Sequence, residues 1–514
     1  MLQIARLTRP SRLAQATLQL GFFALVGAAG GCRAQVTTPR PEALLHLPVA
    51  PPPAVTAAQP QLWVALGAHL GGPGELSLRG AKGALRLRDA RGVSAEAPAF
   101  TLRWHREALP KPLLVRRLVL GPFASFESAE TMAQRWQAAG AQPVIARPRD
   151  WEVWAPAGSP AIPGQTPRLV ERRETQAWVP LLQEPSGARL LVGPIRIEAP
   201  GGLRWNGGLF AGPFRLQADA HGGWTLVEQV PVERYLLGVV PHEIGAGAPP
   251  AALAAQSVLA RTWALRNQHR FSVDGYHLCA DTQCQVYGDP RHAGTAVSRA
   301  IAATGGRVLA WQGQPIHAVY HATNGGVSAA FEEVWAGSPL PYLQAALDGA
   351  RGLTLPLDAT EVSRLLRTSA GAVGADHPRF RWQRQLNAAT LTAAARALDR
   401  RFGEVRRVSV LQRGPSGRVL ALELSGDPGG SAVVLRRDAI RRSLSQLPST
   451  LFVVQPAGPG RWRFEGGGFG HGAGLSQAGA IDLARQGWSL ERILARYYPG
   501  TQLLPLSALS GSAP

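Results

Sequence analysis

The sequence predicts an α+β protein with a mixed, strand-rich body, because strand-like and helix-like segments follow one another without regular order. Short apolar runs separated by glycine turns, typical of strands, fill residues 62–112 and return between Ala188 and Val240. Helical patterns run from Pro249 to Arg266 and, with a short turn inside, from Ala478 to Tyr498. No regular strand–helix–strand alternation connects them, so a doubly wound parallel sheet is not expected. A chain of 514 residues has room for about two to four domains.

The N-terminal residues have the pattern of an export signal. Arginines precede an apolar stretch that ends near Leu25, and small residues follow. This order predicts a secretory signal at residues 1–34, cleaved after Ala34. Gly30-Gly31-Cys32 also resembles a lipoprotein cleavage box, which would place a lipid on Cys32. An uncleaved membrane anchor is the third interpretation.

Residues 35–61 are rich in Pro, Ala and Thr and predict a flexible or polyproline-type linker after the signal. Under each interpretation of the N-terminus, most of the chain lies outside the cytoplasm, in the periplasm or the cell wall. The signal or its lipid is then the only expected membrane contact, because no second long apolar run follows.

The charge of the chain favours an anionic partner. The formal net charge is +20, and most of the cations are arginines. Such an excess predicts attraction to a polyanion, although genome composition alone can also enrich arginine. Because the chain is predicted to be exported, we do not expect nucleic acid as a partner. Anionic cell-wall polymers and phospholipid headgroups remain as candidates.

Glu243 is the first candidate for chemistry. It follows His242 in "VVPHEIGAGAPP", which begins like the HExxH zinc-protease motif. That motif needs a second histidine at the position of Ala246, and Gly245 and Gly247 disfavour a helix, so the metalloprotease interpretation fails. What remains is a carboxylate between a loop and a helix. It is either a reactive acid or a carboxylate that complements a helix dipole.

Residues 113–156 predict a small lobe in the order strand, turn, helix, strand, strand. The helix spans Ser125 to Gly140, and the Ser125 side chain is placed to cap it. The order and the Gly121-Pro122-Phe123 turn resemble a SPOR domain. That resemblance implies binding of peptidoglycan glycan strands that lack stem peptides. An ordinary α+β lobe is the alternative.

Four further stretches carry a second resemblance: "VPVERYLLGVVPHEI", "YHLCADTQCQVYGD", "AVYHATNGGVSAAFEEVWAGSPLPYL" and "GGGFGHGAGLSQAGAIDLARQGWSLERILARYYPGTQL". Their order and spacing resemble the SpoIID family, which includes stage II sporulation protein D and the amidase enhancers. The resemblance implies a SpoIID-like domain over residues 185–505, with a helix beside a catalytic cleft.

The family resemblance implies a role in peptidoglycan remodelling. Its sporulation members are lytic transglycosylases that cut glycan strands freed of peptides, and the position of their catalytic Glu corresponds to Glu243. His242 departs from the small polar residue expected there. One acid suffices for this reaction, because the 6-hydroxyl of muramic acid attacks C1, so we expect Glu243 to be partly desolvated with a raised pKa. Other relatives are non-catalytic enhancers of an N-acetylmuramoyl-L-alanine amidase, which is the alternative function and the alternative partner.

The resemblance also implies residues that bind the glycan. It places the glycine-rich loop "FGHGAGLSQAGA" in the cleft, and no G-x-S-x-G elbow supports a serine hydrolase instead. Two aromatic residues, Tyr287 and Trp335, are candidates to stack on sugar faces. The expected substrate-binding residues are Arg261, His321, Asn324, His471, Ser476 and Gln477.

The cysteines of the exported part predict a crosslink. Cys279 and Cys284 are close in sequence, which in an oxidising compartment indicates a disulfide or a metal site. Some family members bind zinc near this position, but Gln283 stands where their histidine would be, and glutamine is a poor zinc ligand. We therefore expect a disulfide and no cofactor, with a zinc site built on His277 and the two cysteines as the weaker alternative.

Overall fold

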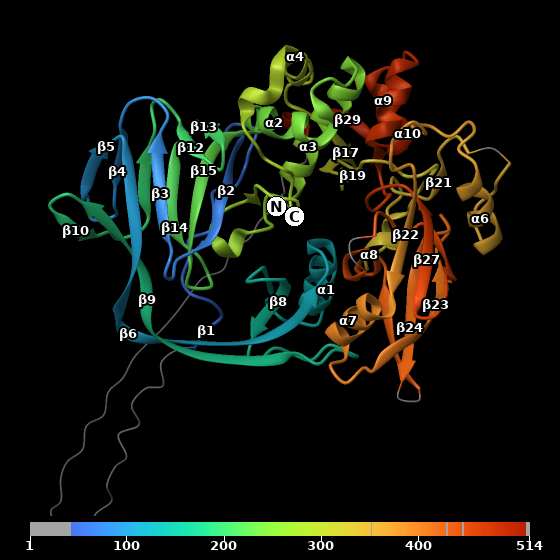
Figure 1. Cartoon of the computed structure of the whole chain (residues 1–514). Helices are drawn as coiled ribbons and strands as arrows, with labels where there is room; N and C mark the ends of the chain where they lie inside the picture. The colour runs from blue at the N-terminus through green and yellow to red at the C-terminus, as the bar shows by residue number, and fades with distance from the viewer. Residues whose placement is uncertain (1–42, 351, 428–429, 445–446, 510–514) are drawn as a thin grey trace, which may run out of the picture. The chain divides into compact units, whose positions relative to one another are not determined.

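The computed structural model describes residues 43–350, 352–427, 430–444 and 447–509 (Figure 1). The predicted export signal, the lipidation candidate Cys32 and the first residues of the linker lie outside these ranges. The structure is 24% helix and 37% strand, which confirms the strand-rich α+β class. In the described ranges, no helix combines the length and the apolar character that crossing a membrane requires.

Two large sheets form the first half of the described chain, and most of their strands pair antiparallel. The first has the order β10-β9-β6-β3-β12-β13, with β1 and β8 paired to β6 and β7 paired to β8. Its strands are β1 (Ala43–Leu44), β3 (Glu75–Gly80), β6 (Ala99–Phe123), β7 (Val144–Ala146), β8 (Trp151–Pro156), β9 (Arg168–Glu184), β10 (Gly187–Leu190), β12 (Leu203–Trp205) and β13 (Gly208–Phe210).

The second sheet has the order β16-β2-β15-β14-β11-β4-β5. Its strands are β2 (Gln61–Leu70), β4 (Leu85–Arg88), β5 (Ser94–Ala97), β11 (Ile195–Glu198), β14 (Phe214–Ala218), β15 (Trp224–Pro231) and β16 (Leu278–Cys279). Period-two patterning explains them: in β4, Leu85 and Leu87 are buried while Arg86 and Arg88 are exposed. Strand β2 begins at Gln61, where the predicted linker ends.

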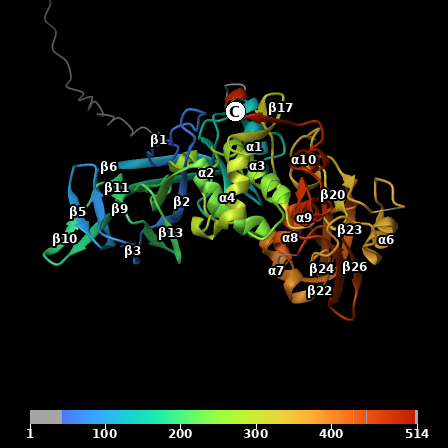
Figure 2. The same cartoon turned by 90° about the horizontal axis from the view of Figure 1, so that it is seen from above.

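A group of helices packs between this sheet and the C-terminal part of the chain (Figure 2). The central helix is α3, which begins one residue after the predicted start and ends where predicted. All its residues from Ala252 to Leu265 except Ala254 are buried, because α2, α4, α9 and α10 surround it. The helices are α2 (Val232–Val240), α3 (Pro250–Arg266), α4 (Gly294–Ala303), α9 (Gln477–Arg485) and α10 (Leu490–Tyr497), with 3-10 turns η2 (Ser272–Asp274) and η3 (Pro290–Ala293) nearby.

Short strands bring two predicted motifs together. Strand β19 (Tyr320–His321) pairs in parallel with β28 (Leu475–Ser476), so "YHATNGG" lies beside "GHGAGLSQ" although about 150 residues separate them. The remaining short elements of this region are β17 (Arg307–Trp311), β18 (Gln314–Pro315), β20 (Val327–Ser328), α5 (Phe331–Val334), β21 (Ala346–Leu347), β29 (Gln502–Pro505) and η4 (Leu506–Ala508).

A second hydrophobic core, separate from the one around α3, lies in the C-terminal half. Two three-stranded sheets enclose it, with the orders β22-β27-β26 and β23-β24-β25. Its elements are β22 (Arg381–Asn387), α7 (Ala388–Leu398), β23 (Glu404–Arg413), β24 (Val419–Asp427), β25 (Ser431–Arg436), α8 (Asp438–Ser443), β26 (Phe452–Pro456) and β27 (Arg461–Gly467). Helix α6 (Ala359–Arg367) contacts β26 and β27 but buries Val362 and Leu365 in a smaller cluster of its own.

The SPOR-like segment forms the predicted elements but shares its core with the neighbouring residues. Helix α1 (Phe126–Ala138) begins after Ser125, whose side chain accepts a hydrogen bond from the Ser128 amide as expected. Phe126 and Trp136 of α1 belong to one buried cluster with Phe271 and Tyr276. The boundary predicted at residue 112 lies inside the single strand β6. This lobe is therefore packed against the SpoIID-like part.

Candidate active site

Glu243 lies in a π turn. Helix α2 continues directly into η1 (Pro241–Gly245), in which the backbone widens to the π form before α3 begins at Pro250. Single π turns are rare and occur often at functional sites. The expected loop is therefore a helical extension. Because Glu243 follows the C-terminal end of α2, it cannot complement a helix dipole, which favours cations at that end.

Three groups hold the Glu243 carboxylate. The Val286 amide donates to Oε1 at 3.2 Å. The side chains of Tyr320 and Gln477 also form hydrogen bonds with it. The contacts come from three separate parts of the chain, and each is a neutral group.

A polar network behind Glu243 orients Tyr320. The Gln285 side-chain amide donates to the Tyr320 hydroxyl oxygen at 2.8 Å, and its own carbonyl oxygen accepts from the Tyr235 hydroxyl at 3.1 Å. Because the Tyr320 oxygen accepts from Gln285, its O–H is left to donate toward Glu243. Sequence reasoning missed Tyr320 and Gln285. Their only signal is that they lie inside two of the four quoted motif stretches.

Burial raises the pKa of Glu243 to about 7, against an ordinary value of 4.5. Desolvation disfavours the charged carboxylate, and it outweighs the hydrogen bonds from Val286, Tyr320 and Gln477, which lower the pKa. The expected raised pKa is confirmed. Neither His242 nor Arg261 is among the causes of this shift.

Glu243 lines a cavity of about 240 Å³. Its walls come from η1 and α3, from the loop after β16, from β19, and from α1 and α8, which lie near each other in Figure 1. The cavity-lining residues that matter below are Glu127, Glu243, Arg270, Tyr320, Trp335, Asp438, Arg441, Arg442 and His471.

The other two carboxyl groups among the described residues lining this cavity are ion-paired. Both Nη groups of Arg270 donate to one oxygen of Glu127 at 3.0 Å. Arg441 and Arg442 donate to Asp438 at 2.8 and 2.7 Å. Although burial alone would raise the pKa of Glu127 and of Asp438, the arginines outweigh it and the net shift is downward. Both groups are therefore charged carboxylates at neutral pH.

Arg261 does not lie in this cavity. Its side chain is fully buried, and Nε and Nη2 each donate to a different oxygen of Glu233 at 2.7 Å. Nη1 donates to the carbonyl of Arg307 at 3.0 Å. These contacts join α3 to its surroundings, so the predicted role in substrate binding is replaced by a structural one.

Three other predicted residues lie in the motifs but outside the cavity lining. Asn324 is fully buried and donates to Asp348 at 2.7 Å. Ser476 caps α9 by accepting from the Gly479 amide at 3.1 Å. His321 is 5% exposed and contacts the carbonyl of Ala473 at 3.1 Å. In this structure these residues shape the two joined loops.

His471, Trp335 and Gln477 lie close to Glu243's cavity. His471 lines it, but its Nε2 donates to the carbonyl of Tyr320 at 2.9 Å and its Nδ1 accepts from the Ala473 amide at 3.2 Å. Both ring nitrogens are thus used by the backbone. The Trp335 ring lies 5.1 Å from that of His471, and it lines the same cavity.

Cys279 and Cys284 form the predicted disulfide. Their sulfurs are therefore not free thiolates for zinc. His277 is buried, accepts from the Trp63 amide at 2.8 Å and has its other ring nitrogen 2.9 Å from the carbonyl of Pro53. These residues do not fit the zinc site that some family members carry.

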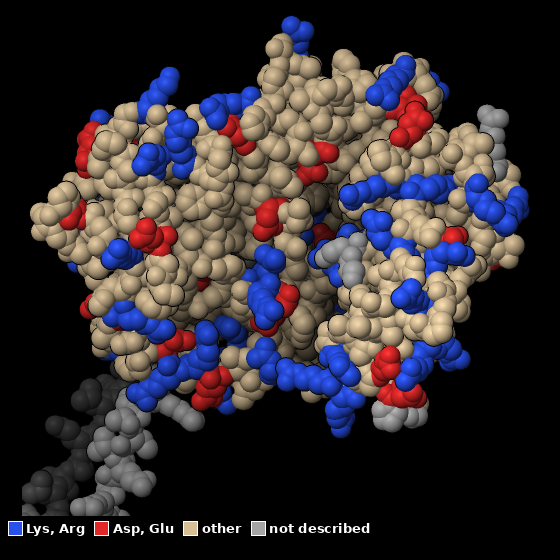
Figure 3. Space-filling view, in the orientation of Figure 1, with Lys and Arg blue, Asp and Glu red and all other residues tan. Residues whose placement is uncertain are grey.

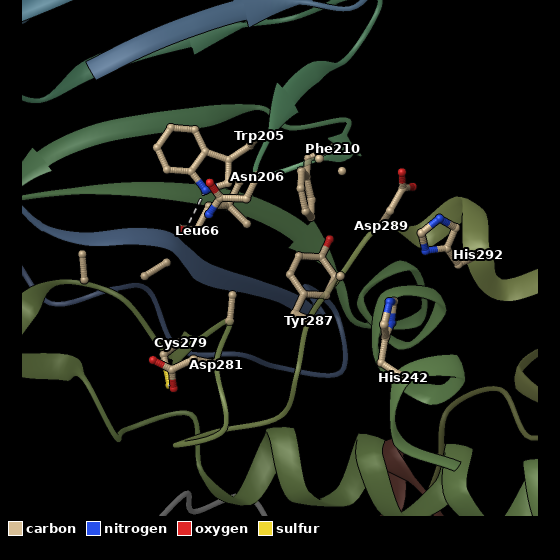
Figure 4. Close-up of a pocket in the computed structure, with 16 residues that line it drawn as sticks. Leu66, Trp205, Asn206, Phe210, His242, Cys279, Asp281, Tyr287, Asp289 and His292 are labelled. Atoms are coloured by element: carbon tan, nitrogen blue, oxygen red, sulfur yellow. Dashed lines mark hydrogen bonds between the residues drawn. The ribbon is translucent and has the colours of Figure 1, made fainter. Parts of the chain in front are cut away.

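A second cavity, of about 450 Å³, is lined in part by Cys279 and Asp281 of the disulfide loop (Figure 4). His242 lines this one, so the adjacent side chains of the π turn face different cavities. Trp205, Tyr287 and His292 also line it. The Tyr287 hydroxyl donates to Glu228 at 2.9 Å, and its ring is 4% exposed, so it forms a wall rather than an open stacking face.

Comparison with known proteins agrees with the motifs. Residues 220–311 match the family model described as stage II sporulation protein, SpoIID. Residues 329–474 match that of a domain of unknown function, DUF8618. Glu243 and the Gln285–Val286 contacts lie in the first match, and Asp438, Arg441 and Arg442 lie in the second. Residues 220–311 are therefore similar to the SpoIID family, the family that the motifs predicted.

The curated proteins to which the chain is similar include stage II sporulation proteins D and an amidase enhancer. The chain is 28% identical over 303 residues to "Stage II sporulation protein D" of Bacillus subtilis (strain 168), covering 54% of this chain and 75% of the relative. The protein of the same name from Bacillus amyloliquefaciens is 28% identical over 299 residues, with the same shares. The "Amidase enhancer" of Bacillus subtilis (strain 168) is 29% identical over 289 residues, covering 52% of this chain and 40% of that protein.

Proposed function

We propose that this protein is an exported lytic transglycosylase that cuts peptidoglycan glycan strands freed of stem peptides. The observation that carries the proposal is the state of Glu243. It is the one described carboxyl group lining its cavity whose pKa is raised, and the value of about 7 suits a group that gives and then takes a proton at neutral pH.

In the proposed reaction, Glu243 donates its proton to the glycosidic oxygen as the bond from C1 of the muramoyl residue breaks. The 6-hydroxyl of the same residue then forms a bond to C1. Its proton passes to the Glu243 carboxylate, so the acid is regenerated and the product is a 1,6-anhydro sugar. No water is consumed and no second carboxylate is needed, in contrast to most glycosidases.

The surrounding residues support this cycle. Tyr320, Gln477 and the Val286 amide hold the carboxyl group without adding a charge that would keep it ionised. The two remaining carboxylates of the cavity are committed to arginines, so neither is an equivalent acid. The net charge of +20 favours contact with an anionic wall.

A second function is favoured by one comparison. Similarity to an amidase enhancer supports a protein that binds glycan and stimulates an N-acetylmuramoyl-L-alanine amidase without cutting the strand. Both functions place the protein outside the cytoplasm, with glycan strands as its ligand. They differ in whether Glu243 is required.

The test is to incubate the protein with amidase-treated peptidoglycan and measure 1,6-anhydromuramoyl products by mass spectrometry. We expect products from the wild type and a loss of about 10²- to 10⁴-fold in rate for Glu243→Gln, because the general acid is removed. Glycan binding by the variant is measured in parallel. Binding without products from either protein would favour the amidase enhancer instead.

A further inference from the structure

The wall of the cavity that α8 contributes carries more positive than negative charge. Asp438 accepts from Nε and Nη2 of Arg441 at 2.8 and 3.3 Å, and from Nε of Arg442 at 2.7 Å. Two guanidinium groups thus share one carboxylate, and both line the cavity. Figure 3 shows Lys and Arg side chains gathered around a hollow in this face.

The arginines of the cavity differ in how many of their N–H donors are available to a ligand. Arg270 is 4% exposed and uses both Nη groups on Glu127 and Asn267, so it is closed to a ligand. Arg442 gives only Nε to Asp438, and neither of its Nη groups has a hydrogen bond to a described residue. Its side chain is 35% exposed. Arg442 therefore presents a fork of donors that Asp438 holds in place.

A planar fork of N–H donors matches a carboxylate better than any neutral group. Strands freed of stem peptides carry a free carboxylate on each muramoyl residue, at the end of its lactyl ether. In intact peptidoglycan the same carbon forms a neutral amide with the peptide. The lactyl carboxylate of the ligand and the guanidinium of Arg442 are thus complementary in charge only after the peptide has been removed.

We propose that Arg442, supported by Asp438 and Arg441, binds the lactyl carboxylate of a muramoyl residue and so selects strands without stem peptides. This inference rests on the proposed function, since it assumes that glycan enters the cavity. Glu243 does not oppose the anion, because it is protonated when it acts as the acid. The reaction that supplies this substrate is then hydrolysis of the lactyl amide, as an amidase carries out.

The proposal is tested by measuring binding in the Glu243→Gln background, where turnover is expected to be about 10²- to 10⁴-fold slower. The ligands are amidase-treated glycan, the same glycan with its lactyl carboxylates converted to methylamides, and an N-acetylglucosamine tetramer. We expect the carboxylate form to bind about tenfold more tightly than the methylamide, because a charge-assisted pair is lost. Adding Arg442→Gln should bring this ratio close to one.

Two further variants make the result specific. Arg442→Lys keeps the charge without the fork and should retain part of the preference. Arg406→Gln removes an arginine that pairs with Asp427 at 3.0 Å on an exposed strand, and should leave the ratio unchanged. Unfolding temperatures show that each variant is folded.

The outcomes separate the two proposals. Equal binding of the carboxylate and methylamide strands, or a preference that survives Arg442→Gln, overturns the role of Arg442 and leaves the proposed function standing. Failure to bind any of the three ligands overturns both.

Discussion

Two walls of one cavity shift the pKa of carboxyl groups in opposite directions. On the wall formed by η1 and β19, Glu243 meets Tyr320, Gln477 and a backbone amide, and its pKa rises to about 7. On the wall formed by α1 and α8, Glu127 and Asp438 are held by arginines and their pKa values fall. Burial opposes ionisation on both walls, so the partners decide the outcome.

This difference teaches which carboxyl group is free to move a proton. A carboxylate locked to a guanidinium stays charged and serves the architecture, whereas one surrounded by neutral donors can exchange its proton near neutral pH. Pairs of titratable groups whose surroundings drive their pKa values apart mark the acid in many active sites. Here the ion-paired wall also fastens the α1 lobe to the residues that follow α3, through Glu127 and Arg270.

The largest effect should come from breaking the ion-paired wall. Glu127→Gln leaves the buried Arg270 guanidinium without its counter-ion, so we expect the free energy of unfolding to fall by about 3–5 kcal/mol in urea denaturation. The matched control is Asp427→Asn, which opens the exposed pair with Arg406 and should cost less than about 1 kcal/mol. A stable Glu127→Gln protein that has lost cleavage would reverse the comparison and make Glu127 the acid.

A smaller effect should appear in the pH dependence of stability. Glu243 titrates at about 7 when folded, against 4.5 ordinarily, so the unfolded chain releases this proton first as pH rises. The stabilising contribution is complete below about 4.5 and is lost as pH approaches 7. Between pH 5 and 8, wild type should lose about 2–3 kcal/mol more than Glu243→Gln. Parallel losses in the two proteins would mean that Glu243 is not desolvated.

Much of the fold could be predicted from local patterns, whereas Glu243 was singled out as a candidate acid by the family resemblance. The Ser125 cap, the proline start of α3 and the close cysteines each depend on near neighbours, and each is present in the structure. The π turn was missed because Gly245 and Gly247 indicate a break, whereas α2 continues through Glu243. Motif residues were also assigned to the cleft too broadly.

Long-range contacts explain the remaining differences. Arg261 was expected in the cleft, but its partner Glu233 lies 28 positions away on α2. Pro110 and Pro112 stand at the predicted domain boundary, and prolines cannot donate in a sheet. The strand instead passes through them with a register shift between Ala108 and Leu113. The α8 wall lies about 200 residues beyond Glu243, so no local pattern could connect them.

The smallest predicted effect concerns the wall formed by η1 and β19, where Tyr320 is a hydrogen-bond partner of Glu243. Tyr320 lowers the pKa of Glu243 through its hydrogen bond, so Tyr320→Phe should raise that pKa further. The falling limb of kcat/KM against pH reports loss of the acid's proton, so it should move to higher pH, by less than about one unit. The control is Tyr235→Phe, which removes a hydroxyl that donates to Gln285 and not to Glu243. Its limb should stay in place. If the Tyr320→Phe limb also stayed fixed while activity fell, Tyr320 would position substrate instead of tuning Glu243.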